Sequence, residues 1–186
     1  MDAAMALFDE QGYSAVTAVQ IAERAGVTTR TFFRHFPDKP AVLFVDANRL
    51  RAVLVSAVET DTTAESPLEV VMGALARFDW LALGSRGVQH RRYAMIASHQ
   101  ELLERELVKQ YEMAAEFSAA LQRRGTAAPV ADLAAQIGVA VFRTAYRAWL
   151  TDAHDLDFTA AVTAAMAHLV DMTPNRTEDA PVTPES

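Results

Sequence analysis

Apolar residues recur at helical spacing along most of this sequence, and no stretch shows the alternation of β-branched residues that a half-buried strand requires. Alanine and leucine, both strong helix formers, supply many of the apolar positions. With 51% apolar and 22% charged residues among 186, the chain is long and apolar enough to bury one or two compact cores. The sequence therefore predicts an all-α protein.

The first 36 residues predict three short helices separated by glycine turns. Gly12 and Gly26 stand where the first two helices should end. Thr17 and Gln20 have the spacing of a capping box, and Thr28 is a suitable cap for the third helix. The expected helices span residues 2–11, 17–25 and 28–35.

Longer helices are expected behind this region. A fourth helix of about twenty residues should begin at Asp38, with Pro40 tolerated in its first turn. Further capping boxes are expected at Ser66 and Ser98. The remaining helices should span 66–84, 88–97, 99–124, 129–152 and 158–171. We divide the chain into an N-terminal domain (1–45), a C-terminal helical domain (46–172) and a proline-rich polar tail (173–186) that is expected to be disordered.

The second and third helices have the spacing of a helix-turn-helix, because only about two residues, including Gly26, separate them. The expected third helix carries short polar and basic side chains suited to the major groove of DNA. Residues 28–39 contain three basic residues and one acidic residue, a net charge of +2, whereas the whole chain has a net charge of -7. The positive charge is thus concentrated where DNA contact is expected.

Residues 6–44, ALFDEQGYSAVTAVQIAERAGVTTRTFFRHFPDKPAVLF, resemble the TetR family of bacterial regulators. The family pattern is LF-x-x-x-G, then T-x-x-x-IA-x-x-AGV, then T followed by two aromatic residues and x-H-F-x-x-K-x-x-L. The matching positions are Leu7, Phe8, Gly12, Thr17, Ile21, Ala22, Ala25, Gly26, Val27, Thr31, His35, Phe36, Lys39 and Leu43. The resemblance implies a ligand-responsive repressor that binds a pseudo-palindromic DNA operator as a homodimer.

The resemblance also implies which residues contact DNA. They are Thr17, Thr28, Thr29, Arg30, Thr31, Phe33, Arg34, His35 and Lys39. Lys39 is expected on a phosphate, whereas His35 is equally suited to packing or capping. The family usually has tyrosine where Phe33 stands, so one phosphate contact is expected to be lost. Family members also usually carry a few residues, often basic, before the first helix, so a DNA-contacting arm is expected either to lie upstream or to be absent.

The C-terminal domain is unusually rich in large aromatic residues, which suggests a mostly apolar cavity for a small effector. Its expected lining is Phe78, Trp80, Arg92, Tyr93, His99, Tyr111, Phe117, Phe142, Arg143, Tyr146 and Trp149. The effector should be mostly apolar and either uncharged or weakly acidic. Tyr146 is the strongest individual prediction, since it offers a hydroxyl group on an otherwise apolar helix. The same residues could instead simply fill the core.

Two alanine-rich helices, at about 130–152 and 158–171, are expected to form a dimer interface as a four-helix bundle. On that hypothesis, Ala145→Glu or Met166→Glu would give monomers. The expected fourth helix would carry an effector-induced shift to the DNA-binding helices.

Several other functions are disfavoured. The sequence has no cysteine, glycine-rich phosphate loop, H-E-x-x-H motif or nucleophile–base motif, so neither an enzyme nor a cofactor is expected. His99 and Glu101 diverge on a helix, so no metal site is expected. No apolar run approaches a membrane span, which favours a cytoplasmic protein that does not bind membranes. A ligand-independent regulator, an activator, or a helical enzyme or adaptor remain the alternatives.

Overall fold

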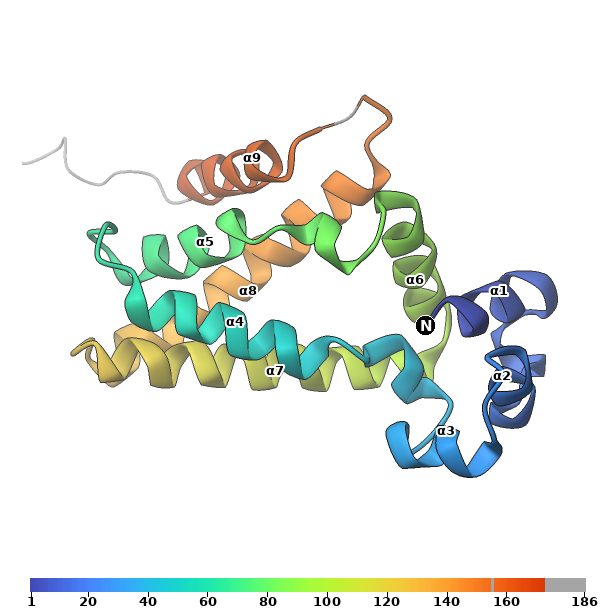
Figure 1. Ribbon diagram of the computed structural model, residues 1–186. Coiled ribbons are helices and arrows are strands. Elements are labelled where there is room, and N and C mark those ends of the chain that lie inside the picture. The colour runs from blue at the N-terminus through green and yellow to red at the C-terminus, as the bar shows by residue number, and fades with distance from the viewer. Residues whose placement is uncertain (155, 173–186) are drawn as a thin grey trace, which may run out of the picture.

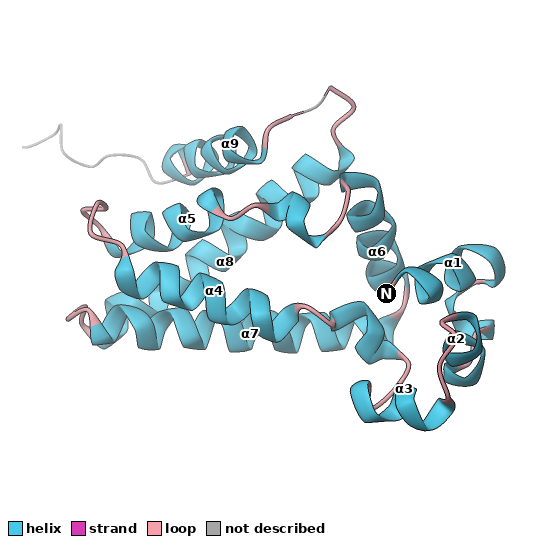
Figure 2. Cartoon of the chain, viewed as in Figure 1, coloured by secondary structure: helices cyan, strands magenta, loops and turns pink. Residues whose placement is uncertain are grey.

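The computed structural model describes residues 1–154 and 156–172, and within these ranges it contains helices and loops but no strand (Figure 2). The all-α prediction is therefore confirmed. The α-helices are α1 (Asp2–Gln11), α2 (Ala18–Arg24), α3 (Thr29–His35), α4 (Ala47–Thr60), α5 (Pro67–Arg77), α6 (Arg86–Ser98), α7 (Gln100–Arg123), α8 (Ala128–Thr151) and α9 (Phe158–Asp171). Short 3₁₀ helices are η1 (Tyr13–Ala15), η2 (Pro40–Phe44) and η3 (Trp80–Leu83). The expected tail, 173–186, lies outside the described residues.

Helices α1, α2 and α3 form an N-terminal unit, residues 1–44, at one end of the molecule (Figure 1). Phe8, Ile21 and Phe32 are buried together at its centre. Gly12 ends α1 with φ 81°, and Gly26 makes the turn after α2 with φ 69°. Residues with a side chain rarely adopt these positive φ values, so both turns depend on glycine. The three predicted short helices are confirmed.

Helices α4 to α9 form the C-terminal unit, residues 47–172. Helices α4 and α7 run side by side, α8 packs against α7, and α9 lies over α5 and α8 (Figure 1). Phe117 of α7 is fully buried in the centre of this unit. Gly138 of α8 meets α5 so closely that an added Cβ atom would lie 2.5 Å from Cγ1 of Val71. Glycine is thus required for this helix crossing.

Local capping signals predicted some helix starts correctly and one wrongly. The capping boxes at Thr17 and Ser66 are confirmed. The box at Ser98 is wrong, because α6 continues through this residue and its hydroxyl donates to the carbonyl of Met95. His99 precedes α7 and supplies no side-chain cap.

The prediction of one long fourth helix from Asp38 is also wrong. The Asp38 carboxylate accepts a hydrogen bond from the N–H of Ala41, which supports only the short helix η2. The chain then turns at residues 45–46, and α4 begins at Ala47. Leu43 and Phe44 in η2 are buried against the N-terminal unit. This inward packing separates η2 from α4.

The predicted helix 66–84 divides into α5 and η3. The break lies at residues 78–79, where the carboxylate of Asp79 accepts from the N–H of Leu81. Trp80 is turned into the core, and its indole N–H donates to the carbonyl of Leu75 over 2.9 Å. Anchoring of this indole ring favours the break over a continuous helix.

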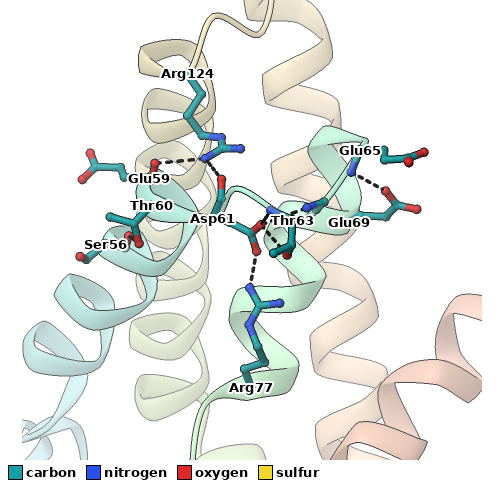
Figure 3. A network of polar contacts seen from close by, with 10 residues as sticks. Ser56, Glu59, Thr60, Asp61, Thr63, Glu65, Glu69, Arg77 and Arg124 are labelled. Carbon is teal, nitrogen blue, oxygen red and sulfur yellow. Dashed lines mark hydrogen bonds and ion pairs between the residues drawn. The ribbon is translucent and has the colours of Figure 1, made fainter.

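Asp61 closes the loop between α4 and α5 with a buried carboxylate (Figure 3). Its Oδ1 atom accepts from the N–H groups of Thr63 (2.7 Å) and Ala64 (3.1 Å). Its Oδ2 atom accepts from Arg77 of α5, while Arg124 after α7 donates to its backbone carbonyl (Figure 3). The Thr63 N–H and then Arg77 hold the pKa of Asp61 well below its ordinary value. One residue thus ties together the ends of three helices.

Candidate functional site: a basic helix and a cavity behind it

Helix α3 presents a polar and basic face at the end of the molecule. Arg30, Phe33 and Arg34 are exposed, and Phe33 keeps 49% of its surface accessible. Phe32 is buried and anchors the helix. The exposed side chains are therefore free to meet a partner, while the opposite side holds the helix in place.

The threonines at the helix starts have partly structural roles. Thr28 accepts a hydrogen bond from the N–H of Thr31 over 3.1 Å, and their two hydroxyls lie 3.0 Å apart. Thr17 caps α2 through Gln20. Thr29 and Thr31 are half-buried on α3, whereas Thr17 and Thr28 are exposed. All four predicted threonines lie at the N-terminal ends of α2 and α3.

The two remaining predicted contact residues differ in their surroundings. His35 is exposed at the end of α3, with Nε2 3.4 Å from Nη2 of Arg34. Lys39 is half-buried, and its ammonium donates to the carbonyls of Tyr13 (2.9 Å) and Val16 (3.0 Å). The same ammonium lies 4.1 Å from the centre of the Tyr13 ring. Lys39 therefore links η1 to η2. The family resemblance predicted a phosphate contact for this lysine and not this structural role.

A cavity of about 460 Å³ lies where the C-terminal unit meets the N-terminal unit, and residues of α4, α5, α6, α7, α8, η2 and η3 line it. Seven of the eleven predicted effector-binding residues line it. They are Trp80, Arg92, Tyr93, Phe117, Phe142, Arg143 and Tyr146. One wall is aromatic: the ring centres of Trp80 and Phe142 are 4.8 Å apart, and Phe142 stacks on Tyr146 at 5.3 Å.

Phe78 and Trp149 were predicted to line the cavity and do not. The ring of Phe78 packs with its edge against Trp80, 4.9 Å between centres. Trp149 packs edge-on against Phe158 of α9 at 5.7 Å. Both are core residues, as the alternative interpretation of the aromatic residues held.

Tyr111 and His99 are also outside the cavity lining. Tyr111 lies on the outer face of α7 and is 70% exposed. The His99 ring lies edge-on to Tyr13 at 4.8 Å, at the contact with the N-terminal unit, and its Nδ1 atom is 2.9 Å from the carbonyl of Met95. The packing of α7 and α6 thus directs these side chains away from the cavity.

Gln89 of α6 is a cavity residue that the sequence did not reveal. Its buried side chain donates from Nε2 to the carbonyls of Trp80 and Gly84, both over 2.7 Å. Its Oε1 atom accepts from the hydroxyl of Tyr146 over 2.7 Å. Burial raises the pKa of Tyr146 to about 12, so this hydroxyl stays protonated at neutral pH. The hydroxyl predicted to serve an effector therefore already has an internal acceptor.

A chain of polar side chains joins the cavity to η2. Gln110 of α7 donates from Nε2 to Oε1 of Glu106 over 3.0 Å, and Oε2 of Glu106 lies 3.7 Å from Nη2 of Arg92. Arg92 of α6 donates from Nε to the carbonyl of Leu43 over 2.5 Å. Its guanidinium carbon lies 5.4 Å from the centre of the Phe44 ring. The cavity wall is thus bonded directly to the last residues of the N-terminal unit.

Two further contacts fasten the units to each other. Arg105 of α7 forms a bidentate pair with Asp38, with distances of 3.0 and 2.7 Å. Burial alone would raise the pKa of Asp38, but the hydrogen bonds from Arg105 and a backbone N–H lower it overall. Ile96 of α6 and Leu102 of α7 are buried with the core of the N-terminal unit. The junction is therefore partly apolar and partly ionic.

Residues 1–154 and 156–172 contain no group of three or more histidine, cysteine, aspartate or glutamate side chains placed to hold a metal ion. No helix in the same ranges is long and apolar enough to cross a membrane.

The N-terminal unit is similar to known regulatory proteins. Residues 1–44 match the model for "Bacterial regulatory proteins, tetR family". The HTH-type transcriptional regulator TcmR of Streptomyces glaucescens is 39% identical over 71 residues, which is 38% of this chain. The matched stretch spans 31% of that regulator's length.

Solved structures show the same fold over nearly the whole chain. Thermus thermophilus FadR, a TetR-family transcriptional repressor in complex with lauroyl-CoA, is 21% identical with a TM-score of 0.58, covering 98% of this chain and 97% of that one. SmeT, the repressor of the Stenotrophomonas maltophilia multidrug efflux pump SmeDEF, was solved with triclosan. In that complex it is 18% identical with a TM-score of 0.61, covering 100% and 95% of the two chains.

Proposed function

We propose that this chain is a ligand-responsive transcriptional repressor of the TetR family, because residues 1–44 match that family's model and a TetR-family repressor shares its fold. In this proposal residues 1–45 bind operator DNA and residues 46–172 bind an effector and form a homodimer. The carrying observation is that the exposed basic helix α3 and the cavity are joined through η2, whose Leu43 and Phe44 line the cavity and belong to the N-terminal core. The role needs neither catalysis nor a cofactor, and it places the protein in the cytoplasm with its operator.

We assign DNA contact to α3 and the residues at its ends. Arg30 and Arg34 would meet base edges or phosphates in the major groove, with Thr29 and Thr31 beside them. Thr17, Thr28 and His35 border this face, which supports phosphate contacts around it, whereas Phe33 can add only an apolar contact to the DNA. Lys39 would contribute mainly by holding η1 and η2 together.

We assign the cavity to a small, mostly apolar effector. Its volume of about 460 Å³ is that of ordinary small-molecule sites, and its wall is largely aromatic and aliphatic. Two proteins of this fold were solved with lauroyl-CoA, which carries a long apolar acyl chain, and with triclosan, and this supports an effector that is at least partly apolar. Effector binding releases the operator only if it favours a conformation that binds DNA poorly.

We place the dimer interface on the outer faces of α8 and α9. Ala160, Ala164 and Ala167 lie exposed on α9, where small side chains permit close approach of a second helix. Ala145, earlier expected to lie in this interface, is fully buried within its own subunit. A charge at residue 145 would therefore disrupt the fold rather than separate subunits, and Met166 is likewise partly packed against the core.

Ala164→Glu tests the dimer without disturbing the subunit core. We expect a folded monomer by sedimentation and loss of operator binding. The matched control is Ala115→Glu, which places the same charge on the exposed face of α7 and should leave a dimer. Dimeric Ala164→Glu protein would place the interface elsewhere, and a monomeric unmodified protein at micromolar concentration would exclude the dimer altogether.

The DNA assignment is tested by selecting bound sequences from random DNA and measuring affinity for the selected site. Arg30→Ala should weaken binding by about 1–3 kcal/mol if the side chain reads a base. Arg24→Ala is the control, because Arg24 is exposed in the same unit but pairs with Glu10. If no DNA is selected, or if both variants bind like the unmodified protein, the proposal fails. If the protein binds a selected DNA site and no compound releases it, the protein would be a ligand-independent regulator.

A further inference from the structure

One buried polar atom in the cavity wall has no partner. The side-chain carbonyl oxygen of Gln110 is buried, and no described residue donates a hydrogen bond to it. Its own amide nitrogen donates to the Glu106 carboxylate, which identifies the oxygen as the unpaired end of this amide in the cavity lining. Leaving a buried acceptor without a donor costs free energy, so this position favours a ligand that supplies one.

The unpartnered atom lies at one end of the polar chain that reaches the N-terminal unit. Gln110 is bonded to Glu106, Glu106 is paired with Arg92, and Arg92 donates to the carbonyl of Leu43 in η2. The pair between Glu106 and Arg92 is long, at 3.7 Å, whereas the bond from Arg92 to Leu43 is short, at 2.5 Å. The longest contact in this series is therefore the one between Glu106, on the side of Gln110, and Arg92, on the side of η2.

Resting on the proposed function, we propose that the effector is an apolar molecule with a hydroxyl or N–H donor that bonds to Gln110, and that Glu106 and Arg92 transmit this binding to η2. The donor holds the Gln110 amide, Glu106 shifts with it, and Arg92 loses its carboxylate partner. Arg92, released from Glu106, then changes position, and its bond to the carbonyl of Leu43 moves η2 with it. Glu106 and Arg92 are positioning residues in this scheme.

Arg51 and Glu112 form a second ion pair in the cavity wall, which makes a natural control. Their side chains are 3.4 Å apart, and both line the cavity. Arg51 lies on α4 and Glu112 on α7, and neither is bonded to Gln110 or to η2 in the described structure. Changes to this pair alter the charge of the wall while leaving the chain to Leu43 intact.

The ligand chemistry is tested with compound pairs that differ only in the donor, namely 4-phenylphenol with 4-methoxybiphenyl, and 1-decanol with 1-methoxydecane. Binding is followed by calorimetry and by the fluorescence of the two tryptophans, of which Trp80 lines the cavity, so no DNA is needed. We expect at least one hydroxyl compound to bind about tenfold more tightly than its ether, and Gln110→Met to abolish that difference. Equal binding of both members of each pair, discrimination that survives Gln110→Met, or no binding by any compound would overturn the assignment.

The transmission step is tested by the ratio of operator affinities without and with a saturating hydroxyl compound. Glu106→Gln should reduce this ratio to near one, while Glu112→Gln keeps the unmodified ratio, both variants being checked for folding by circular dichroism. An unchanged ratio in Glu106→Gln, or an equal loss in Glu112→Gln, would refute the polar chain as the route. Failure of the unmodified protein to bind any DNA would instead count against the proposed function, and the calorimetric test would still decide the ligand chemistry.

Discussion

The two ends of the C-terminal unit are held together in different ways. At the end far from α3, the Asp61 carboxylate is satisfied by two N–H groups and Arg77, and Arg124 bonds to the same residue. At the near end, Arg92 and Glu106 make a longer contact in the wall of a cavity. The far end therefore has no long contact of this kind, while the near end combines the close Arg105–Asp38 pair with the longer Arg92–Glu106 contact beside a cavity. On the proposed function, we expect a change that begins in the cavity to reach the N-terminal unit.

Phe117→Ala should cause the largest loss of unfolding free energy, because it removes a buried ring from the core between the two ends. Phe117 is fully buried and also lines the cavity, so the change should cost about 3–5 kcal/mol of unfolding free energy. Tyr111→Ala on the exposed face of the same helix is the control and should cost about 0.5 kcal/mol or less. Urea denaturation measures both, and similar losses would show that the burial pattern of α7 is wrong.

Gly138→Ala tests the close crossing of α5 and α8. The added methyl group would collide with buried Val71, so we expect a loss of about 1–3 kcal/mol. Gly87→Ala on α6 is the matched control, because its methyl group would meet only Arg91 at 3.8 Å. That variant should be stabilised by about 0.5–1 kcal/mol, as alanine favours a helix over glycine. A neutral Gly138→Ala variant would indicate that the crossing is wider.

Acid should lower the unfolding free energy by protonating Asp61 at the far end, and this loss should be smaller than those of Phe117→Ala and Gly138→Ala. Its folded-state pKa lies below the unfolded value of about 3.9, so the ionised carboxylate stabilises the fold at neutral pH. That contribution is fully present above the unfolded pKa and is lost as the pH falls through it toward the folded-state pKa. Urea midpoints measured at decreasing pH should therefore fall less steeply for Asp61→Asn than for the unmodified protein. Glu116→Gln, on an exposed part of α7, should keep the original slope.

The smallest effect is expected at the junction between the units. Asp38 and Arg105 form a bidentate pair, but 41% and 33% of their side chains are exposed to solvent, which screens the attraction. Asp38→Asn should cost no more than about 1 kcal/mol at low salt and less at high salt. A larger, salt-independent loss in denaturation experiments would mean that the junction is as closely bonded as the Asp61 end.

The capping signals show how well local sequence predicts where helices begin. At Thr17 and Ser66 the threonine or serine and its partner three residues later form the predicted box. Ser98 has the same spacing, yet α6 continues through it. The motif specifies which bonds are available, whereas the packing of Ile96 and Leu102 against the N-terminal unit decides where the helix bends.

The sequence predicted only some of the residues that line the cavity. The aromatic content of residues 66–152 indicated a cavity, and seven predicted side chains line it. Gln89 and Gln110 were missed, because single glutamines on helices have no pattern that distinguishes a buried side chain from a solvated one. Gln89 is held by Tyr146, which lies 57 positions away in the sequence. Gln110 is held by Glu106, which lies only four positions away but belongs to no recognisable motif.

The sequence by itself determined the short helices of the N-terminal unit, the glycine turns at Gly12 and Gly26, and the basic face of α3. These features depend on residues within a few positions of one another, where backbone φ, capping and helical spacing decide the outcome. Only the tertiary structure decided that Lys39 is bonded inside the unit, and that Phe117 is buried while Tyr111 is exposed. These outcomes depend on which helices pack together, because a side chain's surroundings come from segments far away in the chain.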